Sequence, residues 1–363
     1  MSKIKKDKIL IVGGYGAVGS VLAKTLAARY PDKVIVGGRN KEKAWQLINS
    51  NHLRAIAIEI DLEKKEFSNI PFEEIHTAIC CIEVLSNNYF IERCIKEQVN
   101  YTELATSFEA YNRLMKYKEE IIRAQIVLIP GVGLMPGLSN VFAFQASNKM
   151  QHIHSVNSFL LLGLGELHGL DAIRWMLAYA HRKFSIHSSN GIKQVRTFSD
   201  PVAVRLLNER KNRVFYRWDF ADQHVIPMVI NVKSAETRMA FDSRFVTLLF
   251  AGLQKTGILR IIKRVNPAIV RKLLSMVRMG TNQFAVQTRV QGMDNNKTLK
   301  EITYLASGAG EALATGIIAS YAVECMYNDD GHFGIKHFEE IISMDYFFQF
   351  IKSKGIAIQT EIK

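Results

Sequence analysis

The sequence has 363 residues, of which 48% are hydrophobic and 22% charged, with a formal net charge of +13. This length accommodates two domains, and the composition indicates a globular chain and excludes intrinsic disorder. Apolar runs of about 18 uncharged residues are missing from the sequence, so we expect no transmembrane helix. The N-terminus leads directly into the first predicted strand, which leaves no room for a signal peptide. The cysteines have no metal-ligand spacing, so we expect reduced thiols, no bound metal and a cytoplasmic protein. They are Cys80, Cys81, Cys94 and Cys325.

A glycine-rich loop follows the first predicted strand, which covers residues 9–12. Gly14, Gly16 and Gly19 form G-x-G-x-x-G, and an apolar-periodic helix over residues 20–29 comes next. In such a unit the first glycine permits a tight turn, the second lets the backbone approach a pyrophosphate, and the third allows the helix to pack closely. The pattern predicts a dinucleotide site whose pyrophosphate lies at the helix N-terminus. Its candidate residues are Gly13, Gly14, Gly16, Ala17, Val18 and Gly19.

The end of the second predicted strand, residues 33–38, indicates which dinucleotide is bound. A carboxylate at this place favours NAD, but none occurs here before Glu42. Arg39 follows the strand instead, and a guanidinium suits the 2′-phosphate of NADP. Arg39 and Asn40 therefore predict NADP(H) rather than NAD(H). The alternative is that Arg39 and Lys41 belong to a solvated loop.

Further strands alternate with helices as far as residue 130. The strand over 54–61 places Asp61 and Leu62 near the adenine, although Asp61 is also suited to capping a turn. The strand over 76–82 runs beneath the cofactor and brings Cys81 and Ile82 towards the nicotinamide. The strands over 100–106 and 126–130 follow, each after a predicted helix. This alternation predicts an α/β fold with a doubly wound parallel sheet.

Four segments carry further motifs. They are Ile11–Gly19 with Val36–Arg39, Cys94–Glu103, Gly131–Asn140, and Thr315–Ile317 with Gly334–Glu340. In order and spacing they resemble the saccharopine dehydrogenase family of NAD(P)-binding oxidoreductases. The second resembles its C-x-E-x-G-x-x-Y-x-D segment and the third its G-x-x-P-G-L-S-N turn. The chain departs from the family at two places: Gln98-Val99 replaces the glycine step, and Thr102-Glu103 replaces the family's acid, an aspartate, after the tyrosine.

The resemblance implies a division into parts. Residues 1–130 form an N-terminal Rossmann domain, and residues 131–310 form a mixed α/β domain for substrate binding and homodimerisation. Residues 311–363 are C-terminal helices that return to the Rossmann domain. Within the second domain we expect strands over 157–163 and 281–291, and a hairpin turn at 294–297.

Hydride transfer also requires groups that move a proton and bind the substrate. Tyr101 and Glu103 are candidates for proton transfer or amine binding, with a core tyrosine and a strand acid as the alternatives. The helix start at Pro136–Asn140 is a candidate site for a substrate carboxylate. In the loop over 163–171, His168 is a candidate general acid, with a histidine of a surface loop as the alternative. Asp171 of the same loop equally suits a helix N-cap. Arg174 is a candidate clamp for a carboxylate.

We therefore expect an NADP-dependent oxidoreductase that reduces the imine of an amine and a keto acid. One alternative is reduction of a C=C or C=O bond in an acyl or polyketide-like intermediate. Another is a regulator that binds NADP(H) without oxidising it. An extended short-chain dehydrogenase would need Tyr-x-x-x-Lys, and the one match, Tyr179 with Lys183, lies beyond the expected position.

The stretch 243–293 is basic and apolar and contains no acidic residue. It predicts basic amphipathic helices, broken at Asn266-Pro267. Three functions fit: a pocket or lid for an acidic or acyl-chain substrate, a membrane-surface patch, or a dock for a partner protein. The alternative is a solvated basic face whose apolar side lies in the core or a dimer contact. We do not expect nucleic-acid binding, because aromatic stacking residues do not accompany the charge.

Overall fold

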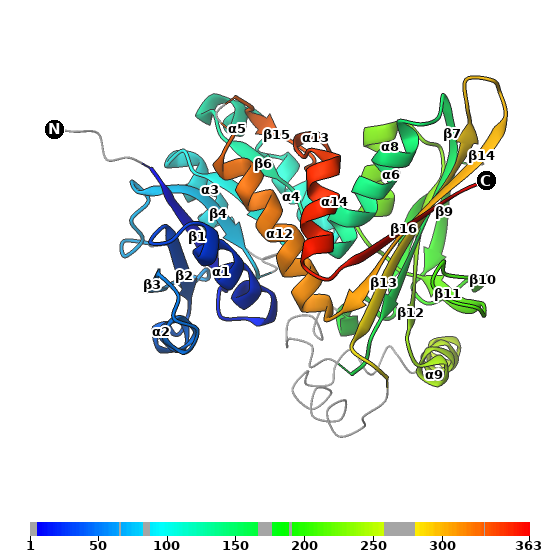
Figure 1. The fold of residues 1–363 in the computed structure, drawn as a ribbon, viewed down its shortest axis with the longest axis horizontal. Coiled ribbons are helices and arrows are strands. Elements are labelled where there is room, and N and C mark those ends of the chain that lie inside the picture. Colours follow the sequence, from blue (N-terminus) through cyan, green and yellow to red (C-terminus); the bar gives the residue numbers. More distant parts are fainter. Residues whose placement is uncertain are drawn as a thin grey trace. The chain divides into compact units, whose positions relative to one another are not determined.

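A computed structural model describes residues 6–64, 67–82, 88–165, 176–188, 191–257, 280–329 and 331–363 (Figure 1). The chain forms two compact units. Unit 1 comprises Met1–Gly133 and Thr315–Ser343, and unit 2 comprises Leu134–Ala314 and Met344–Lys363. Each unit is built on its own seven-stranded sheet, so the predicted α/β class is confirmed.

Unit 1 contains a parallel sheet with the strand order β15-β6-β5-β4-β1-β2-β3. The order reverses between β1 and β4, which makes the carboxyl ends of these two strands the expected place for a ligand. The strands are β1 Lys8–Val12, β2 Val34–Gly38, β3 Ala55–Glu59, β4 Ile75–Cys80, β5 Asn100–Glu103, β6 Val127–Ile129 and β15 Gly334–Ile335. The helices are α1 Ala17–Arg29, α2 Lys41–Ser50, α3 Tyr89–Lys96, α4 Phe108–Met115, α5 Lys118–Ala124, most of α12 Glu311–Tyr327, and α13 Phe338–Ile341. This is the predicted Rossmann architecture.

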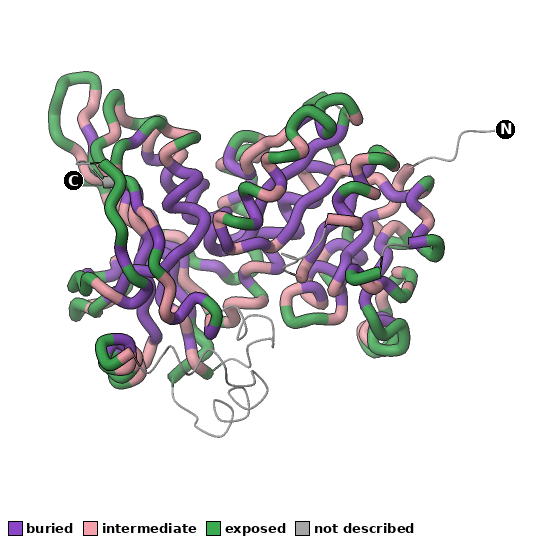
Figure 2. The backbone as a smooth tube through the Cα atoms, turned by 180° about the vertical axis from the view of Figure 1, so that it is seen from behind, coloured by how far each residue is buried: buried purple, intermediate pink, exposed green. Residues whose placement is uncertain are grey.

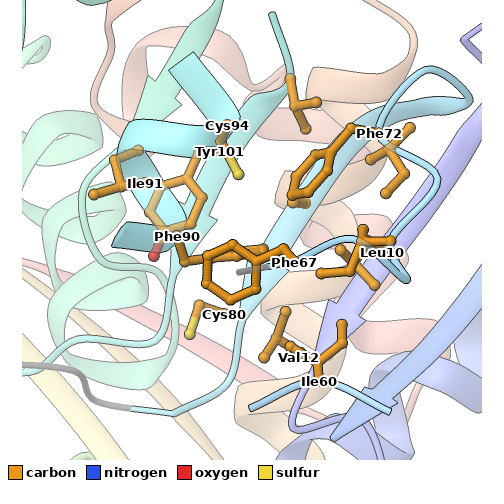
Figure 3. Packing of buried hydrophobic residues seen from close by; sticks show 14 of the residues in the cluster. Leu10, Val12, Ile60, Phe67, Phe72, Cys80, Phe90, Ile91, Cys94 and Tyr101 are labelled. Carbon is orange, nitrogen blue, oxygen red and sulfur yellow. The ribbon is translucent and has the colours of Figure 1, made fainter. Parts of the chain in front are cut away.

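Aromatic rings fill the core on one side of this sheet (Figure 3). Phe90, on α3, is surrounded by Phe67, Phe72 and Tyr101, with ring centroids 5.6, 6.3 and 6.1 Å from its own. These rings pack against apolar side chains such as Leu10 of β1. Side chains from one face of β1, β2, β4, β5 and β6 therefore share one continuous core.

Unit 2 contains a mixed sheet with the order β10-β11-β12-β7-β13-β14-β16. Its strands are β7 His152–Leu162, β10 Val202–Val204, β11 Arg213–Arg217, β12 Ala235–Phe241, β13 Gln283–Met293, β14 Leu299–Ala309 and β16 Ala357–Ile362, and β8 Lys183–Ser188 pairs with β9 Gly191–Arg196 in a separate hairpin. The helices are η1 Leu134–Leu138, α6 Ser139–Ser147, α8 Asp222–Ile230, α9 Arg244–Thr256 and α14 Met344–Ser353. Helix α6 contacts β7 and β13, and α8 contacts β12. The strands expected near 157–163 and 281–291 and the hairpin turn at 294–297 are confirmed by β7, β13 and β14.

The C-terminal part differs from the expectation that residues 311–363 return to the first domain. Residues from Thr315 to Ser343 do so. In this part Gly316 lets α12 approach α1, because an added Cβ would lie 2.6 Å from the Cβ of Val21. Met344–Lys363 instead joins unit 2, since β16 pairs with β14 and completes the edge of the second sheet.

All four cysteines are free thiols. None of the helices in the described part of the chain is long and apolar enough to span a membrane. Figure 2 shows buried positions along the inner strands and along helices such as α6, whereas the edge strand β16 is largely exposed.

Candidate cofactor site

The glycine loop between β1 and α1 has the geometry that a dinucleotide-binding turn requires. Gly13 has a φ of +76°, a left-handed conformation that favours glycine. The Gly13 and Gly14 N–H groups donate to the carbonyl of Gly37 at 2.8 and 3.0 Å, which ties the loop to β2. An added Cβ at Gly19 would collide with the Gly13 carbonyl oxygen. Gly13 and Gly19 therefore each have a backbone reason to be glycine.

The N-terminus of α1 is open to an anion. Gly16 is the N-cap residue, and both Gly16 and Ala17 are exposed. No side chain in the described residues caps this end, and the first turn contains no acid. A helix start with free N–H groups and a positive dipole is suited to a pyrophosphate. Val18 continues the same turn.

The carboxyl end of β2 contains a contact that the sequence did not predict. The Tyr15 ring lies against Gly38, where an added Cβ would be 2.9 Å from its Cζ atom. The Tyr15 hydroxyl accepts a hydrogen bond from the Asn40 N–H at 3.1 Å. The Asn40 side chain caps α2 by accepting from the Lys43 N–H at 3.0 Å. Tyr15 therefore fixes the turn that presents Arg39.

Arg39 itself is exposed and makes no hydrogen bond or ion pair with any described residue. The guanidinium is therefore available to a ligand at this strand end.

The ends of β3 and β4 hold the other predicted cofactor residues. Asp61 caps a turn, since its Oδ1 accepts from the Glu63 N–H at 3.1 Å, and Leu62 is buried. The Cys81 N–H donates to the Val12 carbonyl at 2.9 Å. Ile82 covers Gly13, where an added Cβ would lie 2.8 Å from its Cγ1. Burial raises the pKa of the Cys81 thiol well above its usual range, so it stays protonated.

Tyr101 and Glu103, on β5, lie together in the interior rather than at a surface. Each is only 3% exposed, and the Tyr101 hydroxyl donates to Glu103 Oε2 at 2.7 Å. Arg113, on α4, donates from Nη2 to both carboxylate oxygens at 2.7 Å. Burial raises the pKa of Glu103, while the charge and hydrogen bonds of Arg113 oppose that rise. Burial likewise raises the pKa of Tyr101 well above its usual range.

This Tyr101–Glu103–Arg113 triad has the geometry of a structural network. The hydroxyl proton of Tyr101 is already donated, and both carboxylate oxygens of Glu103 already accept. The sequence predicted the first two residues as a pair, but it did not single out Arg113. A basic residue one helix later has no local pattern that marks it as the partner.

The Gly131–Asn140 segment lies in the interior, and every residue from 131 to 143 is buried. Asn140 Oδ1 accepts from the Gly137 N–H at 3.2 Å, so the amide occupies the turn at the start of α6.

Unit 2 also contains a buried carboxyl group on α8. Asp222 is fully buried, and its Oδ1 accepts from the Thr237 hydroxyl at 2.8 Å. Burial raises the pKa of Asp222.

Asp242 ties together three segments of unit 2. Its Oδ1 accepts from the Leu164 N–H at 3.2 Å and from the Ser243 N–H at 2.8 Å. Its Oδ2 accepts from the Thr281 hydroxyl at 2.9 Å. The start of the predicted active-site loop is therefore fixed to α9 and β13. His168, Asp171 and Arg174 lie outside the described residues.

Comparisons with known proteins agree with this geometry. The model of the saccharopine dehydrogenase NADP binding domain matches residues 9–129. Residues 9–129 therefore resemble the nucleotide-binding domain of the saccharopine dehydrogenase family. The predicted resemblance to the saccharopine dehydrogenase family is confirmed over these residues.

Two solved structures share the fold of this chain. One is saccharopine dehydrogenase (L-Glu forming) from Saccharomyces cerevisiae, with a TM-score of 0.71 at 13% identity, covering 98% of this chain and 100% of that one. The other is homospermidine synthase from Legionella pneumophila in complex with NAD, with a TM-score of 0.67 at 12% identity, covering 99% and 92%. A comparison with curated proteins gives no match.

The departure from the saccharopine dehydrogenase pattern at Gln98 has a structural meaning. Gln98 has a φ of 54°, and it ends α3 with a Schellman motif. In this motif the Gln98 N–H donates to the Ile95 carbonyl at 3.1 Å, and the Val99 N–H donates to the Cys94 carbonyl at 2.8 Å. The family's glycine suits this left-handed position, and the chain retains the conformation with glutamine.

Proposed function

We propose that this chain is an NADP(H)-dependent reductase of an imine formed between an amino acid and a keto acid, or catalyses the reverse oxidation. The preference for NADP(H) rests on Arg39, which is exposed at the end of β2 and pairs with no residue in the described part of the chain. The 2′-phosphate of NADP is a dianion, and a guanidinium binds it with two donors. The substrate class is supported by the resemblance to the family and by the activity named for the yeast structure.

Each candidate residue has a role in this proposal. When bound, the nicotinamide supplies a hydride to the imine carbon. His168 gives a proton to the imine nitrogen, and Arg174 binds a substrate carboxylate. The buried Tyr101 and Glu103 fasten the carboxyl end of β5 to α4, because Arg113 of α4 donates to both carboxylate oxygens of Glu103.

The coenzyme proposal is tested by the affinities for NADPH and NADH before and after Arg39→Ala. We expect NADPH to bind more tightly, and the variant to lose about 10-fold or more in NADPH affinity with little change for NADH. Arg54→Ala is the matched control, since Arg54 is equally charged and pairs with Asp32 near the start of β3. A preference of the unmutated protein for NADH would contradict the proposal.

The chemical proposal is tested by NADPH oxidation with pairs of amines and keto acids, and separately with enoyl thioesters. Turnover with the first set supports imine reduction, and turnover with the second supports the acyl alternative. Binding of NADPH without oxidation in either set would support a regulator. His168→Ala should bind NADPH normally and lose kcat, and an unchanged kcat would remove His168 from the mechanism.

A further inference from the structure

Helix α9 presents an apolar face to the solvent. Phe245, Leu248 and Leu249 occupy positions i, i+3 and i+4 and are 66%, 59% and 48% exposed. Gly252 follows on the same side, where an added Cβ would meet no described atom within 4 Å. Figure 2 shows exposed positions along this helix. Three large apolar side chains grouped on one helix form a patch that indicates an interaction.

The opposite face of α9 is fixed to unit 2. Thr247 is buried, and its hydroxyl accepts from the Phe241 N–H at 3.0 Å. Gln254 is also buried, and its Nε2 donates to the Thr197 carbonyl at 2.7 Å. Ala251 lies between them. Because these contacts set the rotation of the helix, the apolar face is held outward.

Positive charge accompanies this face. Arg244 and Lys255 are both exposed and lie eleven positions apart in the sequence. Eleven residues make about three helical turns, so the two side chains point to the same side of the helix within about 20°. They therefore line one border of the apolar patch about three turns apart. The sequence from Ser243 to Met293 contains nine Lys and Arg residues and no Asp or Glu. The excess of positive charge in this stretch of sequence favours an anionic partner.

We propose that α9 docks on an anionic lipid surface, with its apolar side chains between the headgroups and its cations at the level of the phosphates. A convex row of protruding Leu and Phe side chains suits insertion into a headgroup layer, and bordering cations add attraction to acidic lipids. An acidic protein would also attract the cations, but its surface would have to supply a pocket for each of the three apolar side chains.

The test is co-sedimentation of the full chain with vesicles of phosphatidylcholine alone and with added phosphatidylserine. We expect binding to the anionic vesicles at low salt and loss of binding at high salt. Leu248→Ser with Leu249→Ser should reduce binding about 10-fold, because both side chains lose their insertion. Arg244→Gln with Lys255→Gln should reduce it by about 10-fold or more.

Matched controls keep the result specific to α9. Ile192→Ser removes a 72% exposed apolar side chain from β9 of the same unit, and Arg210→Gln with Lys211→Gln removes two exposed charges from a turn. Both controls should bind like the unmutated protein, and circular dichroism confirms that every variant is folded. The proposal is overturned if the unmutated protein ignores anionic vesicles, or if the α9 variants bind as well as the controls. It is also overturned if the leucine variant dissociates a dimer while lipid binding persists.

Discussion

Replacing Arg113 with methionine removes both hydrogen bonds that the Glu103 carboxylate receives from a cation, while a long side chain still fills the space. Glu103 then keeps only the Tyr101 hydroxyl as a partner from the triad. Removing one partner of a buried ion pair costs about 3–5 kcal/mol. Since a domain is stable by about 5–15 kcal/mol, unit 1 should lose a large part of its free energy of unfolding.

The pH dependence follows from the raised pKa of Glu103. An acid whose pKa is higher in the folded state destabilises that state as pH rises from the unfolded pKa towards the folded one. Without Arg113 the folded pKa rises further. The loss caused by Arg113→Met should therefore be larger at about pH 8 than at about pH 5.

The assay is urea unfolding at both pH values, with the double variant Glu103→Leu with Arg113→Met beside the single one. Replacing both charges leaves no buried carboxylate, so the double variant should recover most of the stability. Arg123→Met on α5 is the control, because this exposed side chain lies 4.0 Å from Glu120, and its loss should cost about 0.5 kcal/mol or less. Two results would contradict this prediction. One is an equal loss of unfolding free energy at both pH values in Arg113→Met, and the other is a double variant as unstable as Arg113→Met alone.

Four further outcomes follow from particular contacts. Gly19→Ala should abolish NADPH binding and lower the melting temperature, whereas Gly252→Ala, with open space around it, should leave the melting temperature equal or higher. Gln98→Gly should raise the free energy of unfolding by about 0.5–1 kcal/mol, since glycine adopts the left-handed φ at less cost. A lower free energy of unfolding would show that glutamine is not strained at this position. Asp222→Asn should gain stability relative to the unmutated protein as pH rises above about 4, because burial raises the Asp222 pKa; a constant difference would exclude this titration. Asp242→Ala should lower kcat while NADPH affinity stays unchanged, as it frees the start of the loop that carries His168; an unaffected kcat would refute this positioning role.

The sequence predicted the first domain well because its signals are local. The apolar run before Gly14, the glycine spacing and the strand–helix alternation each depend on neighbouring residues. The positive φ of Gly13 and the close approach at Gly19 are direct consequences of that pattern. The parallel sheet was predictable as well, since it follows from repeated β–α units, whereas the edge strand β15 lies in a segment that was predicted to be helical.

Contacts between distant residues were not predictable in the same way. Tyr15 was treated as a variable position between glycines, yet its hydroxyl binds the Asn40 N–H. Arg113 binds Glu103 of the preceding strand, and Asp242 binds Leu164 and Thr281, which lie 78 and 39 residues away. No spacing rule marks either kind of partner. The final strand, β16, was taken as part of a helical return, because an edge strand with exposed positions lacks the buried apolar run of a central one.

The central claim is that the glycine loop and Arg39 together form an NADP(H) site. Isothermal titration of the full chain with NADPH and with NADH tests it most directly. We expect one site per chain, with NADPH bound at least about 10-fold more tightly than NADH, and loss of that difference in Arg39→Ala. Tighter binding of NADH, or binding of neither dinucleotide, would contradict it.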